Sequence, residues 1–295
     1  MERSVVITGA TGGIGQASAF ALARAGYRVI GTARNTDKAG ILRERAERAG
    51  MTIETVLLDV TDERSCEDAF ARIAARTDGG PWCVINNAGI AKAGAIEDIG
   101  DTDVRELIET NVIAPARISR LVLPTMRRRG TGRIINISSV GGRVSIPLNG
   151  WYSVSKHGLE SLSDVLRVET ARDGVQVVLI EPGAFATDIW EASAKSIPAG
   201  TESSYSDAYV HGRRLLASMK DLPGPERVAR TIVRAVTARK PRPRYLVGTD
   251  AHLAARAEAL LPTALMDWGK QVLVGLRAPR LTARLWRKAP TATER

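Results

Sequence analysis

The feature that most constrains the fold is an alternation of short apolar runs with longer segments of helical periodicity over the first two thirds of the chain. The runs are rich in Val and Ile and nearly continuously apolar, as strands covered on both faces must be. Strands that alternate with helices in this way form a parallel sheet. The expected strands are residues 4–8, 28–32, 53–58, 82–86, 133–138, 175–180 and 244–247.

Helical patterns fill the intervals, at residues 13–25, 37–49, 62–76, 102–128, 152–172, 225–238 and 250–260. We therefore expect an α/β fold with a single-domain, Rossmann-type, doubly wound parallel sheet flanked by helices. After Pro182 the regularity fails, and residues 184–224 are expected to form a loop and a helix that contact substrate. No linker is apparent, so the expected domain is 1–250, followed by a helical, basic C-terminal extension at 251–295.

The net charge of the 295-residue chain is +10. Residues 276–295 contain six basic side chains and one acidic side chain, so they account for +5 of this excess. Surfaces that bind nucleic acid interleave basic residues with stacking aromatics. The aromatic content is only 4% and no such motif is present, so we expect no nucleic-acid partner.

The two cysteines, Cys66 and Cys83, and the three histidines match no metal-ligand spacing, and no metal site is expected. The N-terminus has no secretory signal pattern. No uncharged apolar run approaches the roughly 20 residues that a membrane-spanning helix needs. These observations predict a cytoplasmic protein with reduced thiols.

A glycine cluster directly follows the first expected strand and opens the first helix, from Thr8 to Gly15 (TGATGGIG). Glycines in such a turn let the backbone approach a pyrophosphate, and the helix N-terminus offers free N–H groups. The second strand ends without the acidic residue that usually binds the ribose 2′-hydroxyl of NAD. Arg34 stands there instead, and its guanidinium suits a 2′-phosphate. The pattern favours NADP(H) over NAD(H).

Tyr152 and Lys156 are four residues apart at the start of an expected helix, so both project from one face. A nearby ammonium stabilises a phenolate and lowers the tyrosine pKa from its usual value near 10. Ser139 follows the fifth strand, at the carboxyl edge where open α/β sheets bind ligands. The three side chains suit acid–base chemistry on a carbonyl or alcohol, although a Tyr–Lys pair at this spacing is common on surface helices.

In combination these motifs resemble those of the classical short-chain dehydrogenases/reductases, from residue 4 to about 190. The glycine cluster fits TGxxxGxG, residues 86–89 (NNAG) fit the segment after the fourth strand, and residues 152–156 (YSVSK) fit YxxxK. Ser139 stands thirteen residues before Tyr152, which is the family spacing. Asn111 falls at the position of a catalytic asparagine in the family.

The resemblance implies a role for each of these residues. Tyr152 would exchange the proton, Lys156 would lower the Tyr152 pKa and bind the nicotinamide ribose, Ser139 would orient the substrate oxygen, and Asn111 would hold a water in a proton relay. The cofactor contacts would come from Thr8, Gly9, Thr11, Gly13, Ile14, Gly15, Arg34, Asp59, Val60, Asn87, Ala88, Gly89, Tyr152, Lys156, Pro182, Gly183 and Thr187. Many NADP-preferring members carry a basic residue where this chain has Gly12, so the NADP(H) prediction depends mainly on Arg34.

Residues 139–152, 245–252 and 260–262 are similar to the 17β-hydroxysteroid and retinol dehydrogenase branch of this family. That similarity implies a lipophilic substrate, such as a steroid, a retinoid, a long-chain aldehyde or a polyketide-like ketone. The candidate pocket residues are Leu148, Trp151, Phe185, Ile189 and Trp190. Each of them could equally pack in the core or in a lid.

The amphipathic tail at 268–286 combines Leu, Val and Trp with arginines. It could lie on an anionic membrane surface, and it could equally cover the pocket or a partner subunit. Family resemblance implies a homo-oligomer. A non-enzymatic dinucleotide-binding scaffold or sensor is the alternative function, and it is disfavoured because Asn111, Ser139, Tyr152 and Lys156 are all present. The glycine spacing disfavours an epimerase or dehydratase of the extended family.

Overall fold

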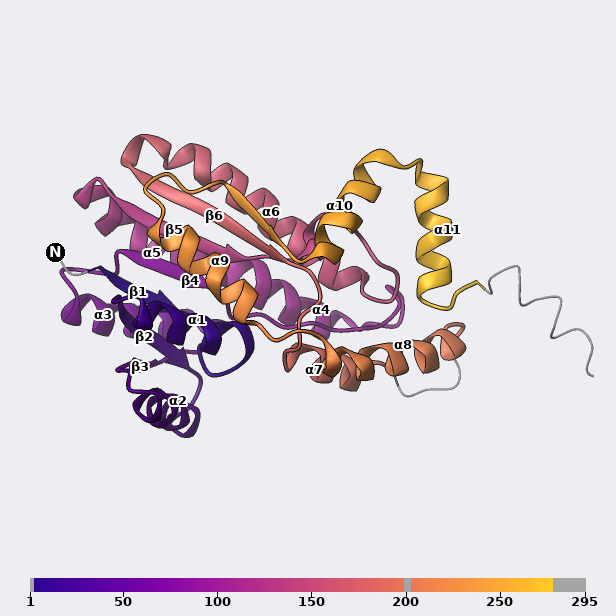
Figure 1. The fold of residues 1–295 in the computed structure, drawn as a ribbon, viewed down its shortest axis with the longest axis horizontal. Coiled ribbons are helices and arrows are strands. Elements are labelled where there is room, and N and C mark those ends of the chain that lie inside the picture. The colour runs from indigo at the N-terminus through magenta and orange to yellow at the C-terminus, as the bar shows by residue number, and fades with distance from the viewer. Residues whose placement is uncertain (1–2, 199–202, 278–295) are drawn as a thin grey trace, which may run out of the picture.

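A computed structural model describes residues 3–198 and 203–277 of the chain. Its strands form one parallel sheet in the order β3-β2-β1-β4-β5-β6-β7 (Figure 1). The strands are β1 (Ser4–Ile7), β2 (Arg28–Ala33), β3 (Glu54–Leu57), β4 (Cys83–Asn86), β5 (Gly132–Ile137), β6 (Val175–Pro182) and β7 (Arg244–Val247). The strand order reverses between β1 and β4, which confirms the doubly wound sheet.

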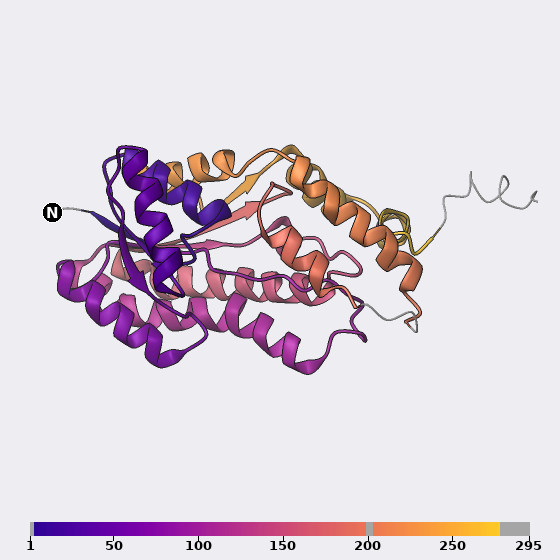
Figure 2. The ribbon, with the colours of Figure 1, turned by 90° about the horizontal axis from the view of Figure 1, so that it is seen from below.

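Helices cover both faces of the sheet (Figure 2). One face packs against α1 (Gly13–Arg24), α2 (Thr36–Arg48) and α9 (Glu226–Thr237). The other packs against α3 (Glu63–Arg76), α5 (Ala114–Arg129) and α6 (Gly150–Glu169). Successive strand side chains point to opposite faces, so Val5 belongs to the first core and Val6 to the second. Both faces are therefore dry, which explains the continuously apolar strand sequences.

The long helix expected at 102–128 contains a local irregularity. It consists of α4 (Asp101–Ile108), a π-helical turn at Glu109–Ile113, and α5. A π-turn inserts an extra residue into an α-helix and often occurs at a functional site. Asn111 lies in the middle of this turn and is buried, so the irregularity sets the direction of its side chain.

Beyond the carboxyl ends of the strands lies a cap of four helices (Figure 1). The helices are α7 (Ile189–Ser196), α8 (Ser206–Ser218), α10 (Thr249–Leu260) and α11 (Thr263–Leu273). A small apolar cluster that includes Ala93, Ile197 and Tyr209 joins α7 and α8 to the loop after β4. The region expected as a loop and one helix thus contains two helices. The division at residue 250 stays a prediction, and most of the basic tail lies outside the described residues.

Within the described part of the chain, none of the helices has the length and apolar character that a membrane crossing requires.

Candidate active site

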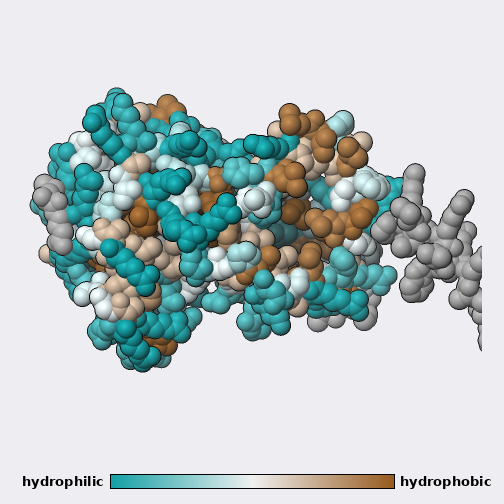
Figure 3. Space-filling view, in the orientation of Figure 1, coloured by the Kyte–Doolittle hydropathy of each residue, from teal (hydrophilic) through white to brown (hydrophobic). Residues whose placement is uncertain are grey.

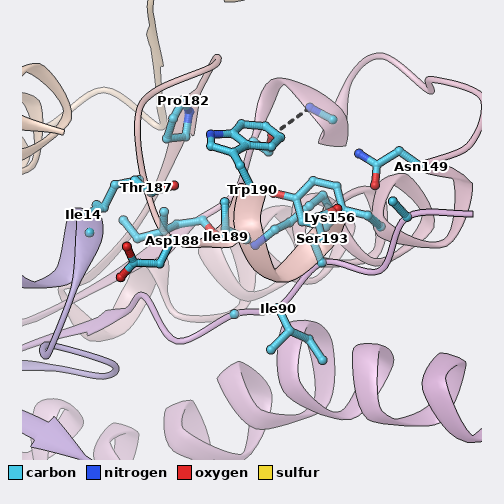
Figure 4. Close-up of a pocket in the computed structure, with 18 of the residues that line it drawn as sticks. Ile14, Ile90, Asn149, Lys156, Pro182, Thr187, Asp188, Ile189, Trp190 and Ser193 are labelled. Atoms are coloured by element: carbon cyan, nitrogen blue, oxygen red, sulfur yellow. Dashed lines mark hydrogen bonds between the residues drawn. The ribbon is translucent and has the colours of Figure 1, made fainter. Parts of the chain in front are cut away.

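A cavity of about 990 Å³ opens at the carboxyl edge of the sheet. The loops after β1, β2, β3 and β4 form one end, and α7, α8, α10 and α11 border the other. In the view of Figure 4, the segment from Thr187 to Trp190 lies between Ile14 of α1 and Lys156 of α6. One continuous space therefore joins the glycine loop, the start of α6 and the helical cap.

The glycine loop has a conformation and a packing that side chains would disturb. Gly9 and Gly13 have φ of +63° and +49°, where residues with a Cβ are strained. A Cβ on Gly9 would lie 3.1 Å from the Ala88 Cα atom. A Cβ on Gly15 would overlap the Gly9 carbonyl oxygen. The loop thus leaves its backbone open to a ligand on one side and packs tightly on the other.

Thr8 connects this loop to the loop after β4. Its buried hydroxyl accepts hydrogen bonds from the N–H groups of Asn87 and Ala88, both at 2.9 Å. The Asn87 amide in turn donates to the carbonyl oxygens of Thr8 at 2.9 Å and Gly9 at 3.1 Å. In the cavity as the described residues form it, Thr8 and Gly15 are not lining residues. Both residues hold the two loops in register, and their contacts with the cofactor stay a prediction.

The other predicted cofactor residues share one location, because all of them line the cavity. They are Gly9, Thr11, Gly13, Ile14, Arg34, Asp59, Val60, Asn87, Ala88, Gly89, Tyr152, Lys156, Pro182, Gly183 and Thr187.

Two basic side chains stand together where the cavity meets the end of β2. Arg34 is exposed and lines the cavity, and so does Lys38 from the first turn of α2. Asn35 caps α2 by accepting a hydrogen bond from the Lys38 N–H at 2.9 Å. Lys38 was not predicted, although it follows Arg34 by four residues at the expected start of a helix.

Asp59 lines the cavity beside this basic pair. Burial raises the pKa of its carboxyl group, but hydrogen bonds from Thr61 and the charge of Arg34 lower it, and the net shift is downward. Asp59 is therefore ionised at neutral pH and orders the loop after β3 through the Thr61 N–H and hydroxyl groups, at 3.0 and 2.7 Å.

Ser139, Tyr152 and Lys156 line the middle of the cavity. The Ser139 hydroxyl accepts a hydrogen bond from the Gly141 N–H at 3.0 Å. A Cβ on Gly141 would lie 3.2 Å from the Tyr152 ring and 3.4 Å from the Ser139 Oγ atom. Lys156 Nζ lies 5.6 Å from the centre of the Tyr152 ring and donates to the Ile137 carbonyl oxygen at 3.0 Å. The predicted trio is thus assembled at the ends of β5 and α6.

The pKa of Tyr152 shifts in the direction opposite to the one predicted. Burial raises it above the usual value, and the hydrogen bond with Ser139 lowers it only in part. Loss of hydration disfavours the phenolate more than nearby groups favour it. Burial also lowers the pKa of Lys156 to about 8, although the charge of Glu160 raises it. At neutral pH, Tyr152 is a phenol and Lys156 remains mostly an ammonium.

Asn111 uses its amide inside the protein. Its Oδ1 atom accepts from the Ile90 N–H at 3.0 Å, and its Nδ2 atom donates to the Ile90 carbonyl oxygen at 2.9 Å and to Ser155 Oγ at 3.0 Å. Ser155 in turn donates to the Tyr152 carbonyl oxygen at 2.7 Å. The amide ties the loop after β4 to α6, and a role in a proton relay stays a prediction.

Four of the five candidate pocket residues line the cavity: Leu148, Phe185, Ile189 and Trp190. Trp190 donates its indole N–H to the Phe185 carbonyl oxygen at 2.6 Å, which fixes the ring. Trp151 is not among the described residues that line the cavity, and its part in substrate binding stays a prediction. Its indole N–H points to the Ile96 carbonyl oxygen at 3.2 Å, because the first turn of α6 directs it outward.

Asp250 was also missed. Its Oδ2 atom accepts a hydrogen bond from the Ala184 N–H at 2.7 Å. A Cβ on Gly183 would overlap that same oxygen. The first turn of α10 therefore holds the loop after β6, next to Pro182 and Thr187.

The family model for short chain dehydrogenases matches residues 3–197. Among curated proteins, the chain is 34% identical over 271 residues to YusZ of Bacillus subtilis (strain 168), described as an uncharacterized oxidoreductase; the match covers 88% of this chain and 94% of that protein. It is 34% identical over 283 residues to 17-beta-hydroxysteroid dehydrogenase type 6 of Rattus norvegicus, covering 90% and 87%.

Two solved structures share the fold. A short-chain dehydrogenase from Streptomyces avermitilis is 33% identical with a TM-score of 0.76, covering 94% of this chain and 99% of that one. A single-substitution variant of the actinorhodin polyketide ketoreductase, with NADPH, is 28% identical with a TM-score of 0.72, covering 86% and 97%.

The chain therefore belongs to the short chain dehydrogenase family and is an oxidoreductase of that family. Its similarity to the 17β-hydroxysteroid dehydrogenase confirms the resemblance to that branch.

Proposed function

We propose that the chain is an NADP(H)-dependent oxidoreductase that transfers a hydride between nicotinamide and the carbonyl or alcohol group of a lipophilic substrate. The observation that carries this proposal is the shared cavity. It brings Arg34 and Lys38 at one end, Ser139, Tyr152 and Lys156 in the middle, and an apolar cap at the other end into one space.

The residues present fit a dinucleotide. Gly9, Gly12 and Gly13 line the cavity without side chains, so the loop admits close approach of a pyrophosphate. Arg34 and Lys38 supply two cations for a 2′-phosphate. The polyketide ketoreductase of similar fold, which holds NADPH, supports this choice.

When bound, NADP(H) supplies or accepts the hydride. In the reducing direction the Tyr152 phenol, protonated because burial raises its pKa, donates its proton to the carbonyl oxygen of the substrate. Ser139 lies beside that hydroxyl and orients the same oxygen. The Lys156 ammonium would bind the nicotinamide ribose hydroxyls, and Asn111 keeps α6 and the loop after β4 in place. The oxidising direction uses the same groups in reverse.

The cap favours a lipophilic substrate, because side chains such as Leu148, Phe185 and Trp190 border the space beside Tyr152. The relative that is named a 17-beta-hydroxysteroid dehydrogenase supports the same class. An apolar wall with few polar groups favours substrates whose apolar body fits the cavity, while Ser139 and Tyr152 determine which oxygen of the substrate reacts.

The test combines binding with turnover. Nicotinamide fluorescence would measure the Kd values of NADPH and NADH, and a panel of steroid, retinoid, long-chain and bicyclic carbonyl compounds would follow, with Tyr152→Phe as the negative control. We expect tighter binding of NADPH and turnover that the substitution removes. If neither nucleotide binds, the proposal fails, and the scaffold function replaces it.

We also propose a homo-oligomer. Val154, Val165 and Val168 on α6 are about half or more exposed, at 48%, 53% and 68%, and Ile113 of the π-turn is 42% exposed. Burial of such side chains against a second copy would remove apolar surface from water. Light scattering after size-exclusion chromatography should give a mass above 31.7 kDa; replacement of the two most exposed valines by Lys should lower it.

Membrane contact is the last part of the proposal, for a cytoplasmic protein peripheral to the bilayer. Apolar side chains gather over α10 and α11, where Figure 3 shows a hydrophobic area. They are Leu253, Leu260, Leu261, Leu265, Trp268, Leu273 and Leu276. The basic residues that follow in the sequence suit an anionic lipid surface. Flotation with phosphatidylserine vesicles should recover the full chain and not a 1–275 protein; equal recovery contradicts the contact.

A further inference from the structure

The turn that leads into α6 contains a backbone conformation that leucine rarely adopts. Leu148 has a φ of +60°, and within the part of the chain that the structure describes it is the only residue other than glycine with a positive φ. The Asn149 N–H donates to the Ile146 carbonyl oxygen at 3.2 Å, which closes a four-residue turn with Pro147 and Leu148 at its centre. Proline followed by a left-handed residue is the pattern of a type II turn, whose third position usually holds glycine or asparagine. Leucine at that position is strained.

The loop after β4 holds this strained turn in place. The Leu148 carbonyl oxygen accepts a hydrogen bond from the Gly94 N–H at 2.8 Å, and Gly94 forms a parallel bridge with Asn149. A Cβ on Gly94 would lie 2.5 Å from the Ile99 Cδ1 atom, so this close approach requires glycine. The Asn149 carbonyl oxygen accepts from the Ser153 N–H at 3.0 Å, where α6 begins. The turn is therefore fixed from both sides.

The same loop also holds two helices of the cap. The Ala93 N–H donates to the Ser196 Oγ atom of α7 at 2.8 Å. The Ala95 N–H donates to the Tyr209 hydroxyl group of α8 at 2.9 Å. Three consecutive N–H groups, those of residues 93–95, thus connect α7, the turn before α6, and α8. These three elements keep a fixed arrangement around the cavity.

The Leu148 side chain forms part of the cavity wall. It packs against the apolar cluster that joins α7 and α8 to the loop after β4, and it lines the cavity together with Tyr152. Because only three residues separate Leu148 from Tyr152, its side chain enters the cavity near the reacting end. In the view of Figure 4, Lys156 lies between Ile14 and Asn149, so the turn lies on the side away from the glycine loop. Glycine would relieve the strain, but it would remove this part of the wall.

We propose that Leu148 is a specificity-determining residue, whose strained turn fixes the width of the cavity beside the reacting carbonyl. The inference rests on the proposed function and narrows its substrate class. The wall admits carbonyl compounds that are unbranched next to the C=O group, such as straight-chain aldehydes and the matching primary alcohols. It excludes compounds with a branch or a ring at that carbon, because the loop after β4 and the cap keep the wall from yielding.

The first readout is thermal stability, which needs no ligand. Leu148→Ala and Leu148→Gly remove the same part of the wall, but only glycine relieves the left-handed backbone, so the Gly variant should have the higher Tm. Leu216 is the matched control, because it packs against the same cluster and lines the same cavity from α8. Within a helix alanine is preferred to glycine, so Leu216→Gly should have a lower Tm than Leu216→Ala.

The second readout is selectivity among three aldehydes with NADPH. Decanal is compared with the same chain carrying two methyl groups on the carbon next to the carbonyl, and with the same chain branched at its far end. The wild type should prefer decanal to the first branched compound. Both Leu148 variants should shift the ratio of kcat/KM values toward that compound by about 10- to 200-fold. The ratio for the chain branched at its far end should stay nearly unchanged.

Failure of this proposal and failure of the proposed function give different results. A lower Tm for Leu148→Gly than for Leu148→Ala, as expected at Leu216, overturns the proposal. So does a ratio that stays at the wild-type value in both variants, or a wild type that prefers the compound branched next to the carbonyl. If the wild type binds neither nucleotide and reduces no aldehyde, the proposed function fails. Calorimetric Kd values of the same three compounds then test the wall by the same ratios.

Discussion

Removing Arg34 and Lys38 should abolish the discrimination between NADPH and NADH while leaving NADH binding intact. Both side chains line the cavity at the end of β2, and a 2′-phosphate is the one group that distinguishes the two cofactors. Water weakens contacts between exposed charges, so a charge-assisted hydrogen bond of about 1.5–3 kcal/mol should be discounted to about 1–2 kcal/mol for each contact.

Each single substitution to Ala should therefore weaken NADPH binding by roughly 5- to 30-fold. The double substitution should weaken it by less than the product of the two single effects, which is roughly 25- to 900-fold, because neighbouring groups couple. The advantage of NADPH should also shrink as salt is raised from about 50 to 500 mM, since screening acts on exposed charges.

The assay is a titration of nicotinamide fluorescence at fixed pH. Arg48→Ala is the matched control, because Arg48 is an exposed arginine at the far end of α2 that pairs with Glu44, and it should change neither Kd. If the double variant keeps the wild-type ratio of the two Kd values, the basic pair does not bind the phosphate, and the NADP(H) proposal loses its main support.

Four further outcomes follow from the site. Tyr152→Phe should retain NADPH binding and lose turnover by about 10²- to 10⁴-fold. Turnover near the wild-type rate would contradict this prediction. Gly15→Ala should destabilise the fold by more than about 3 kcal/mol, as a fall in Tm, because its Cβ would overlap the Gly9 carbonyl oxygen; an unchanged Tm would show that the loop yields. Trp190→Ala should raise KM for a lipophilic carbonyl compound several-fold, while Trp151→Ala should leave KM nearly unchanged. The reverse result would show that the substrate contacts Trp151 and not Trp190. NADPH binding should weaken as pH rises through about 8, because burial lowers the Lys156 pKa to that value and the neutral amine loses its charge; a profile that stays flat well above that pH would remove Lys156 from the cofactor site.

The strands were predictable to within a residue or two because burial on both faces of the sheet forces them to be continuously apolar. The run at 175–180, for example, lies inside β6, which extends to Pro182. The cofactor loops were also predictable, since glycine placement between a strand and a helix is a local property. Lys38 was missed because its place in the cavity wall depends on where α2 begins relative to the neighbouring loops.

Properties set by tertiary surroundings were less accessible. The sequence does not show which way Trp151 points, because the direction of its indole N–H toward the Ile96 carbonyl oxygen is set by the first turn of α6. The pKa of Tyr152 depends on how completely the fold removes water, which no spacing records. The hydrogen bonds of Asn111 depend on the π-turn, whose extra residue has no mark in the pattern of apolar positions.

The hydrogen bond from Ala184 to Asp250 has a consequence for how this protein can be divided. Asp250 stands at the junction between the expected domain and its C-terminal extension, so a cut or graft at that junction changes the loop that carries Pro182, Gly183 and Thr187. Chimeras that exchange C-terminal segments among relatives would therefore exchange part of the proposed nicotinamide site as well as part of the helical cap proposed to contact substrate. Cofactor affinity in such chimeras should vary with the donor of the last helices, even though every residue of the glycine loop is kept.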